Sequence, residues 1–162
     1  MFLAPNVSLK DKRWYVENFH KDPQVLLKDL EITQSVFINK CTESTISIER
    51  KSKGVTVSNC SKTNVLVQDV ITKFELIHCK SMAIQVNGTC GTIDLDSCED
   101  VQIYLASPEA LGCEIFTAQC RNVNVSVLGE SEGEFRELPI PSLYQTKYCG
   151  ESGKLVTVPF IG

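Results

Sequence analysis

The chain has 162 residues, with 43% hydrophobic and 22% charged residues, which is the balance of a soluble globular protein of one domain. Its 16 basic and 20 acidic residues give a net charge of −4, and without a Lys/Arg block this argues against nucleic acid or an anionic membrane as partners. No apolar run approaches the roughly 18 residues of a membrane span, and Met1–Pro5 lacks the basic start of a signal peptide. We therefore expect a cytoplasmic protein.

Residues 1–35 are predicted to form an N-terminal extension and cap. Residues 1–13 are polar and expected to be extended, and an aromatic strand, Trp14–Phe19, follows them. After the break at Pro23, the run Val25–Asp29 resembles half of an imperfect coil. The aromatic strand is expected to cover the open end of the structure behind it, where edge backbone groups would otherwise invite aggregation.

A repeat of fixed length organises residues 36–128. Cys41, Cys60, Cys79 and Cys98 are 19 residues apart, and apolar residues recur five and three positions before and five and seven positions after each cysteine. A fifth copy at Cys120 arrives three residues late, which indicates an insertion at Ser107–Gly112. Such a period is typical of a solenoid.

Each repeat alternates apolar and polar residues, as in Val55–Ser58, which is the periodicity of a strand with one buried face. Two short strands separated by a cysteine corner and followed by a turn make one coil of a parallel β-helix, whose coils stack about 4.8 Å apart. The sequence therefore predicts an all-β solenoid of about six coils. The predicted turns are Glu49–Gly54, Gln68–Lys73 and Asn87–Thr92.

The eight cysteines do not form a metal or disulfide pattern. There is no C-x-x-C pair, and His20 and His78 lack ligand-like spacing to the cysteines, apart from the adjacent Cys79. One cysteine per coil places the thiols in a stack with no preferred partner, and a cytoplasmic setting keeps them reduced. We expect a ladder of buried thiols that pack as small hydrophobic groups.

Side chains between the inward ones must face outward. On the second strand of each coil, Leu66 and Tyr104 occupy outward positions where polar residues are the rule. Isolated exposed hydrophobic residues are normal, so either chance or a binding surface explains them.

Residues 129–162 fall outside the repeat and are predicted to form a linker and a C-terminal hairpin. Two strand-like runs, Leu143–Tyr148 and Lys154–Phe160, flank the glycine-containing loop Cys149–Gly153. An isolated hairpin is marginal in water. It must either cap its own solenoid or pair with a second molecule, and exchange between two chains predicts a homodimer.

Catalysis has little support in the sequence. There is no phosphate-cradling glycine-rich loop, no G-x-S-x-G elbow and no histidine paired with a plausible nucleophile. Acidic pairs such as Asp94 and Asp96 are more typical of a solvated solenoid face than of a hydrolytic site. We expect no enzyme activity and no cofactor or metal.

Several stretches, taken together and in order, resemble the C-terminal β-helix domain of cyclase-associated proteins, which regulate actin monomers. These stretches are Lys12–Glu17, Val55–Lys62, Ile84–Gly88, Cys113–Ile115, Gly133–Phe135 through Pro139–Pro141, and Lys154–Thr157. The other domains of full-length members have no counterpart here, so binding to adenylyl cyclase, profilin or cofilin-decorated filaments is not expected.

The resemblance implies a right-handed β-helix that dimerises by exchanging C-terminal strands. It also implies binding of monomeric actin, preferably in the ADP form, with faster exchange of ADP for ATP. The dimerisation residues would be Lys154, Leu155, Val156, Thr157 and Val158. The actin-binding residues would be Thr56, Ser58, Asn59, Lys62 and Gln85, with the tail Phe160, Ile161 and Gly162, although Pro159 departs from the usual tail sequence.

Two alternatives remain. Tubulin-folding cofactor C has a similar β-helix that supplies an arginine finger to a small GTP-binding protein, and Ala118–Arg121 resembles its motif. Such an arginine accelerates phosphoryl transfer strongly. Arg121, however, occupies the same coil position as Thr42, Ser61, Lys80 and Glu99, which are ordinary polar corner residues. The second alternative is a purely structural dimerisation module.

Overall fold

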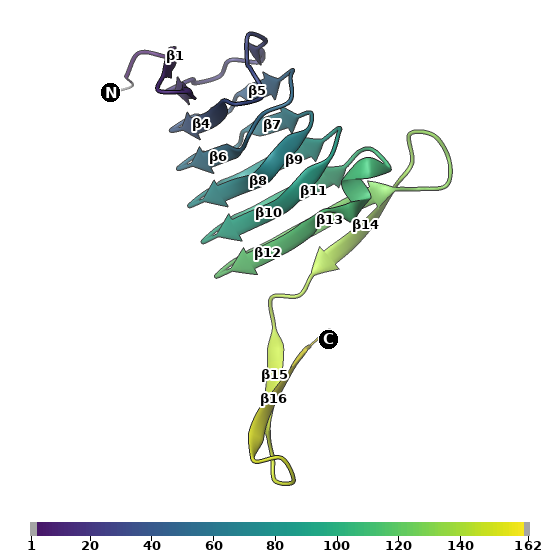
Figure 1. The fold of residues 1–162 in the computed structure, drawn as a ribbon. Helices are drawn as coiled ribbons and strands as arrows, with labels where there is room; N and C mark the ends of the chain where they lie inside the picture. Colours follow the sequence, from purple (N-terminus) through teal and green to yellow (C-terminus); the bar gives the residue numbers. More distant parts are fainter. Residues whose placement is uncertain (1–2, 161–162) are drawn as a thin grey trace.

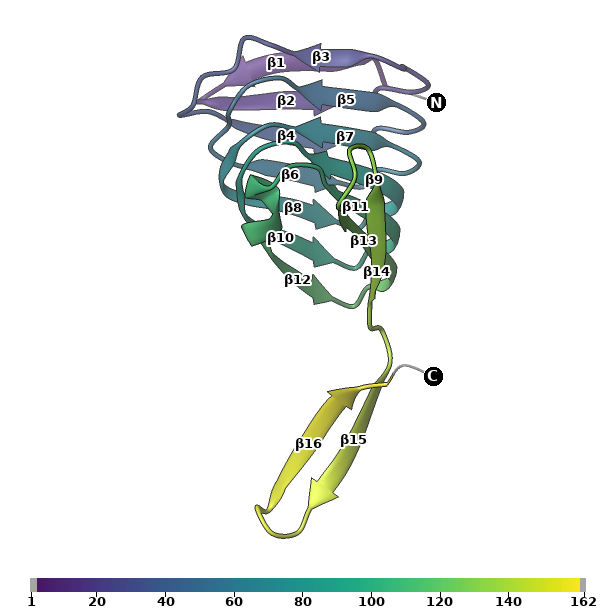
Figure 2. The same ribbon diagram turned by 90° about the vertical axis from the view of Figure 1, so that its right-hand side faces the viewer.

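The computed structural model describes residues 3–160 of the chain. Within these residues, two seven-stranded sheets face each other as the sides of a solenoid, and a separate hairpin follows them (Figures 1 and 2). The first sheet contains, in spatial order, β1 (Asn6–Lys10), β2 (Arg13–Glu17), β4 (Ser35–Asn39), β6 (Val55–Ser58), β8 (Val70–Ile77), β10 (Cys90–Asp96) and β12 (Glu114–Ala118).

The second sheet forms the opposite side of the solenoid. Its strands, in order of sequence, are β3 (Val25–Leu27), β5 (Thr45–Ile48), β7 (Asn64–Val67), β9 (Lys80–Val86), β11 (Glu99–Leu105), β13 (Arg121–Leu128) and β14 (Phe135–Ile140). A 3-10 helix, η1 (Glu109–Gly112), lies in the predicted insertion, and β15 (Tyr144–Cys149) and β16 (Lys154–Pro159) form the hairpin.

The predicted repeat and its register are confirmed. Equivalent residues of successive coils pair in parallel, so the rung that begins at Val36 continues through Val55, Phe74, Ile93 and Ile115. Every inward position on these rungs is buried except in the last coil, where Ile115 is only partly covered. Stacked apolar side chains thus form one continuous core along the solenoid axis.

The corner between the two sheets depends on a repeated backbone conformation. In each coil, the residue before the cysteine and the second residue after it have positive φ, as do Asn59 (52°) and Lys62 (48°) around Cys60. These positions carry polar or long unbranched side chains, which suits the left-handed region because β-branched residues avoid it. The first coil has the same corner, with Phe19 between Asn18 and Lys21 in the cysteine position.

The ladder cysteines Cys41, Cys60, Cys79 and Cys98 are buried as predicted, whereas Cys120 in the last coil is only half-buried, and all eight cysteines are free thiols. Each ladder thiol donates a hydrogen bond to the carbonyl oxygen two residues earlier, for example Cys60 Sγ to Ser58 O at 3.3 Å and Cys98 Sγ to Asp96 O at 3.4 Å. Hydrogen bonds shared with neighbouring thiols, followed by burial, raise the pKa of Cys60 and Cys98. The thiol therefore fills the corner and adds a second hydrogen bond to a carbonyl that already accepts one from a backbone N–H, as Ser58 O does from Lys40 N–H at 3.1 Å.

The turn predicted over Gln68–Lys73 is wrong in its second half, because β8 begins at Val70. The same holds for Asn87–Thr92, since β10 begins at Cys90. Val70 and Cys90 point into the core and close a third side of the coil, where Val70 bridges to the buried Ser52. The sequence did not predict this third side, because a single inward residue within a polar stretch produces no alternation of apolar and polar residues.

The cap at the N-terminal end differs from the prediction. The aromatic strand β2 is itself part of a coil, since Trp14 pairs with Val36 in parallel register. The strand that covers the edge is β1, which pairs antiparallel with β2 and which the sequence suggested only as an extended segment. The edge of β2 is thereby protected.

At the other end, β14 covers the edge of the second sheet only. It pairs antiparallel with β13, with Pro139 opposite Asn124, and an outermost strand tolerates proline because its outer edge needs no partner. In the first sheet β12 is the last strand of the described chain, and its side chains are largely exposed. The predicted hairpin is confirmed and extends away from this end (Figure 1).

Candidate functional site

Thr56 and Ser58 lie on the outward face of the first sheet, and Asn59 and Lys62 lie at the corner that follows it. The positive φ values of Asn59 and Lys62 turn the chain sharply at this corner, and both side chains are exposed just after the end of β6. Asn59 Nδ2 donates a hydrogen bond to Ser58 Oγ at 3.0 Å. These four predicted residues therefore form one continuous polar strip on a single coil.

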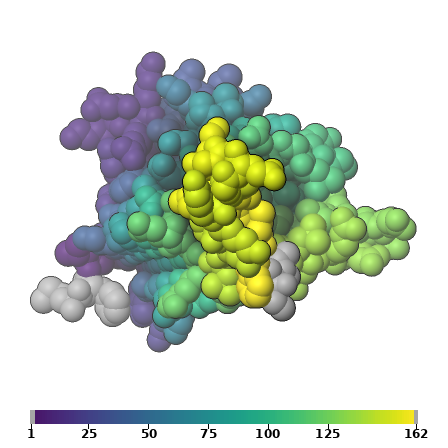
Figure 3. Space-filling view, turned by 90° about the horizontal axis from the view of Figure 1, so that it is seen from below, coloured from purple at the N-terminus to yellow at the C-terminus, as the bar shows by residue number. Residues whose placement is uncertain are grey.

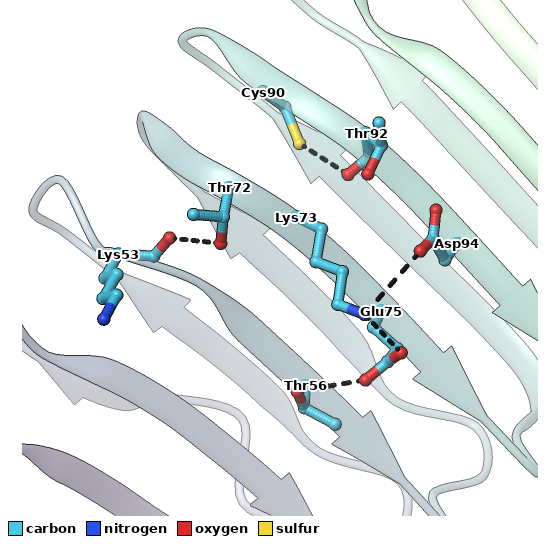
Figure 4. A network of polar contacts seen from close by, with 8 residues as sticks. All are labelled: Lys53, Thr56, Thr72, Lys73, Glu75, Cys90, Thr92 and Asp94. Atoms are coloured by element: carbon cyan, nitrogen blue, oxygen red, sulfur yellow. Dashed lines mark hydrogen bonds and ion pairs between the residues drawn. The ribbon is translucent and has the colours of Figure 1, made fainter.

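The outward face of the first sheet carries a chain of polar contacts next to this strip (Figure 4). Thr56 Oγ1 donates to Glu75 Oε1 at 3.4 Å, and Lys73 Nζ lies 3.2 Å from Glu75 and 4.0 Å from Asp94. Exposed ion pairs stabilise a fold little. Their role here is to hold the side chains of three successive coils in a fixed arrangement on an accessible face.

An aromatic and cationic group lies on the same sheet closer to the N-terminal end. The Arg13 guanidinium stands over the Phe37 ring at 4.5 Å from its centroid, and Tyr15 meets Phe37 edge to face at 5.9 Å. This group was not predicted from the sequence. The group depends on the parallel register of β2 and β4, which places Tyr15 directly beside Phe37.

Gln85 lies on the outward face of the second sheet, away from Thr56 and Ser58. It lines a shallow hollow of about 270 Å³ together with Leu66, Ala83 and Tyr104, and its side chain donates to Asn87 Oδ1 at 2.7 Å. Leu66 and Gln85 are direct neighbours in register. The five predicted surface residues thus divide between two faces that meet at the Asn59–Lys62 corner.

The two unexpected hydrophobic residues, Leu66 and Tyr104, both border this hollow. Tyr104 also meets Phe135 of β14 edge to face, with 5.6 Å between the ring centroids. The outward apolar positions are therefore clustered rather than scattered, and part of their surface is covered by β14.

Arg121 stands at the last corner, at the start of β13. Its side chain is 72% exposed, and its guanidinium lies 3.1 Å from the Glu99 carboxylate in the coil before it. The alignment of Arg121 with Glu99 and Lys80 in one column is confirmed by their register. Arg121 is therefore a polar corner residue that forms an ion pair with the equivalent residue of the preceding coil, Glu99.

The five predicted dimerisation residues all lie on β16, and all are exposed. Alternate residues of β15 and β16 gather on two faces: Tyr144, Tyr148 and Leu155 on one, and Val156 and Val158 on the other. Leu155 is 71% and Tyr148 66% exposed. The hairpin extends away from the end of the solenoid (Figures 1 and 2), and in Figure 3, seen from below, it lies in front of that end.

Of the predicted tail, Phe160 is exposed and its backbone N–H donates to Leu143 O at 2.9 Å. Ile161 and Gly162 lie outside the described residues.

Comparison with known proteins identifies the fold. The family described as adenylate cyclase associated (CAP) C terminal matches residues 3–161. The chain belongs to this family. Adenylyl cyclase-associated protein 1 from Bos taurus is 35% identical over 151 residues, which cover 93% of this chain and 31% of the relative. Adenylyl cyclase-associated protein 2 from Homo sapiens is 34% identical over 156 residues, 96% of this chain and 32% of the relative.

A solved structure of the same family supports the architecture. The crystal structure of cyclase-associated protein from Cryptosporidium parvum matches with a TM-score of 0.91 and 31% identity, covering 97% of this chain and 96% of that chain. The chain spans about a third of the length of the curated relatives that it matches. It corresponds to their CAP C-terminal region.

Among residues 3–160, no group of three or more His, Cys, Asp and Glu side chains could hold a metal ion, and no helix is long and apolar enough to cross a membrane. The pKa values that clearly shift belong to cysteines. The surface of the domain consists of two sheet faces that carry polar and aromatic side chains, a polar corner between them and a hairpin with exposed apolar side chains.

Proposed function

We propose that this domain binds monomeric actin, preferably with ADP bound, and promotes exchange of that ADP for ATP. The observation that carries the proposal is membership of the CAP C-terminal family over residues 3–161, together with the resemblance of the sequence to actin-regulating members. The names of the relatives refer to adenylyl cyclase. Association with cyclase is not part of the proposal, because the chain spans only a third of those proteins.

The proposed actin-binding surface is the polar strip of Thr56, Ser58, Asn59 and Lys62. Its side chains are at least partly exposed, lie on one coil and are supported by a rigid parallel sheet. Rigid support matters because ordering flexible side chains on binding costs free energy. Gln85 and the tail residues Phe160, Ile161 and Gly162 complete the proposed contacts, with Gln85 reached across the corner.

Exchange would follow from differential affinity rather than from a reaction on the domain. A partner accelerates nucleotide release only if it binds the open or nucleotide-free state of actin more tightly than the closed ADP state. A stiff solenoid suits this role, since a surface that does not deform can favour one conformation of its partner over another.

The test is the release of a fluorescent nucleotide from ADP-actin. We expect the domain to accelerate release, and we expect Lys62→Glu to lower the apparent affinity at least tenfold because it reverses an exposed charge in the strip. Lys28→Glu is the matched control, since Lys28 is exposed after β3, and it should leave the titration unchanged. No acceleration at saturating domain would refute the exchange activity.

We further propose that two chains exchange their C-terminal hairpins. The hairpin strands pair only with each other among the described strands, and isolated hairpins are marginal in water. Nearby, the edge of β12 and its exposed Phe116 have no covering strand within residues 3–160. A hairpin from a second chain would cover this end and bury the apolar residues of β15 and β16.

Sedimentation of a chain truncated after Ser152 tests the exchange, because the truncation removes β16. We expect the full chain to sediment as a dimer and the truncated chain as a monomer. A dimer that persists without β16 would contradict the exchange while leaving the actin proposal intact.

A further inference from the structure

Cys90 and Cys113 lie outside the cysteine ladder, yet the fold brings them together. Cys90 begins β10 and Cys113 immediately precedes β12, and these strands are parallel neighbours in which Thr92 pairs with Glu114. Cys90 is buried and Cys113 packs against the same core, with each thiol within reach of the other. Each thiol also donates to a backbone carbonyl, Cys90 to Thr92 and Cys113 to Glu114. In this register Cys113 lies opposite Gly91, so Cys90 is offset from it by one residue. With strands about 4.8 Å apart and a rise of about 3.3 Å per residue, the two Cα atoms are roughly 6 Å apart, which falls within the separation that a disulfide requires.

An irregularity in β10 creates this contact. The register with β8 shifts between Cys90 and Thr92, and a side chain at Gly91 would bring its Cβ within 2.4 Å of the Thr72 carbonyl oxygen. The irregularity turns Cys90 inward, where its Sγ donates to Thr92 O at 3.2 Å (Figure 4). On the other strand, the end of η1 positions Cys113, whose N–H donates to Ala110 O at 3.1 Å.

Access to solvent separates this pair from the ladder. Cys113 is half-buried and stands directly before the exposed strand β12, whereas Cys41, Cys60, Cys79 and Cys98 are fully enclosed. Cys120 is also half-buried, but its sulfur accepts a hydrogen bond from the backbone N–H of Cys98, at 3.5 Å. The pair of Cys90 and Cys113 therefore combines two neighbouring thiols with one half-buried member.

The shared hydrogen bond also divides the roles of the two thiols. The bond from Cys90 lowers the pKa of Cys113, against the opposing effects of burial and of Asp94. The same bond, followed by burial, raises the pKa of Cys90. Because the thiolate is the nucleophile, Cys113 is the thiol that an oxidant attacks first, and Cys90 is the thiol that then forms a disulfide with the oxidised Cys113.

We propose that Cys90 and Cys113 form an oxidation site for hydroperoxides, which converts the two thiols into an intramolecular disulfide. The Cys113 thiolate attacks the peroxide O–O bond, giving a sulfenic acid on Cys113 and, after protonation, water or an alcohol. Cys90 Sγ then attacks Cys113 Sγ. The S–S bond forms as the S–O bond breaks, and the Cys90 proton leaves with the hydroxide as water.

The disulfide would fasten β12, the exposed last strand of the first sheet, to β10. It would also close the loop that contains η1, and closing a loop restricts the unfolded chain. The oxidised chain should therefore melt at a higher temperature than the reduced chain, by roughly 5 to 10 °C.

The test exposes the reduced full chain to hydrogen peroxide, blocks the remaining thiols with N-ethylmaleimide and identifies cross-linked peptides by mass spectrometry without reduction. We expect a Cys90–Cys113 peptide that is lighter by two hydrogens than the sum of its parts. Cys113→Ser should remove this product. Cys149→Ser, which replaces a thiol on the separate hairpin, is the matched control and should leave it unchanged.

A second variant examines the first step alone. In Cys90→Ala no resolving thiol remains, so a sulfenic acid should accumulate on Cys113 and react with dimedone. The proposal is overturned if Cys113 is not labelled in this variant, or if the wild-type chain forms a Cys98–Cys120 disulfide as fast as the Cys90–Cys113 disulfide.

Discussion

The corner residues with positive φ place the strictest local demand on the sequence. Ser81 has a φ of 58°, whereas Ser47 lies in the extended strand β5. Changing Ser81 to Val should destabilise the protein by about 1–2 kcal/mol, because a β-branched side chain is strained in the left-handed region. The free energy of unfolding, measured with urea, checks this.

Ser47→Val is the matched control, since it makes the same chemical change at a half-buried position with extended backbone. Its effect should stay within about 0.5 kcal/mol. Equal effects of the two substitutions would show that backbone strain does not govern the corner.

The inward rungs set the stability of each coil. Ile84 is completely buried between Val65 and Ile103 of the adjacent coils. Ile84→Ala should cost about 2–5 kcal/mol, through lost burial and the cavity that remains. Ile71→Ala makes the same change at a side chain that is 48% exposed, and should cost about 0.5 kcal/mol in the same urea experiment. Similar losses at both sites would contradict a core organised along the rungs.

At the scale of elements, β14 depends on side-chain contacts as well as on strand pairing. Tyr104 and Phe135 pack edge to face across β11 and β14, and such aromatic pairs are worth about 0.5–1.5 kcal/mol beyond their buried area. A double-mutant cycle with Tyr104→Ala and Phe135→Ala should give a coupling of this size.

The control cycle pairs Tyr104→Ala with Phe116→Ala. Phe116 lies on the other sheet, so the two changes should add within about 0.5 kcal/mol. Additivity in the first cycle would mean that the aromatic contact does not hold β14 in place.

Elements with strict periodicity were predictable, because burial on one face leaves a record at every second residue. The rungs carried such a record. The cysteine corner and the insertion followed from the spacing of the repeat, and the hairpin followed from two strand-like runs around a glycine-containing loop. The third side of the coil did not, since a single inward residue such as Val70 sets no pattern. The pairing of β1 with β2 was equally hidden, because β1 is mostly exposed on both faces.

The predicted surface residues followed from resemblance, and periodicity could establish only that they face outward. Which outward residues share a face depends on the sheet to which each strand belongs. That assignment separates Gln85 from Thr56, although both occupy outward strand positions. The Cys90–Cys113 contact needed a bulge in β10, which the repeat pattern does not encode.

At the scale of the whole molecule, the solenoid has unequal ends. Each end leaves one strand edge uncovered among the described residues: β3 at the N-terminal end, where β1 covers β2, and β12 at the other end, where β14 covers β13. The two ends differ because the apolar hairpin follows the end with β12. If hairpin exchange covers that end, folding and association are linked, and a partner that binds only the folded chain stabilises it by mass action. The melting temperature should then rise with protein concentration.

Thermal unfolding at several concentrations measures this linkage. Leu155→Asp should abolish the concentration dependence, because a charge at this site would have to be buried when the hairpin docks. Leu9→Asp is the control, since Leu9 is another exposed leucine, on β1 at the opposite end, and it should leave the concentration dependence intact. A wild-type melting temperature that does not change with concentration would exclude exchange as a source of stability, because association that buries the hairpin must favour the folded chain.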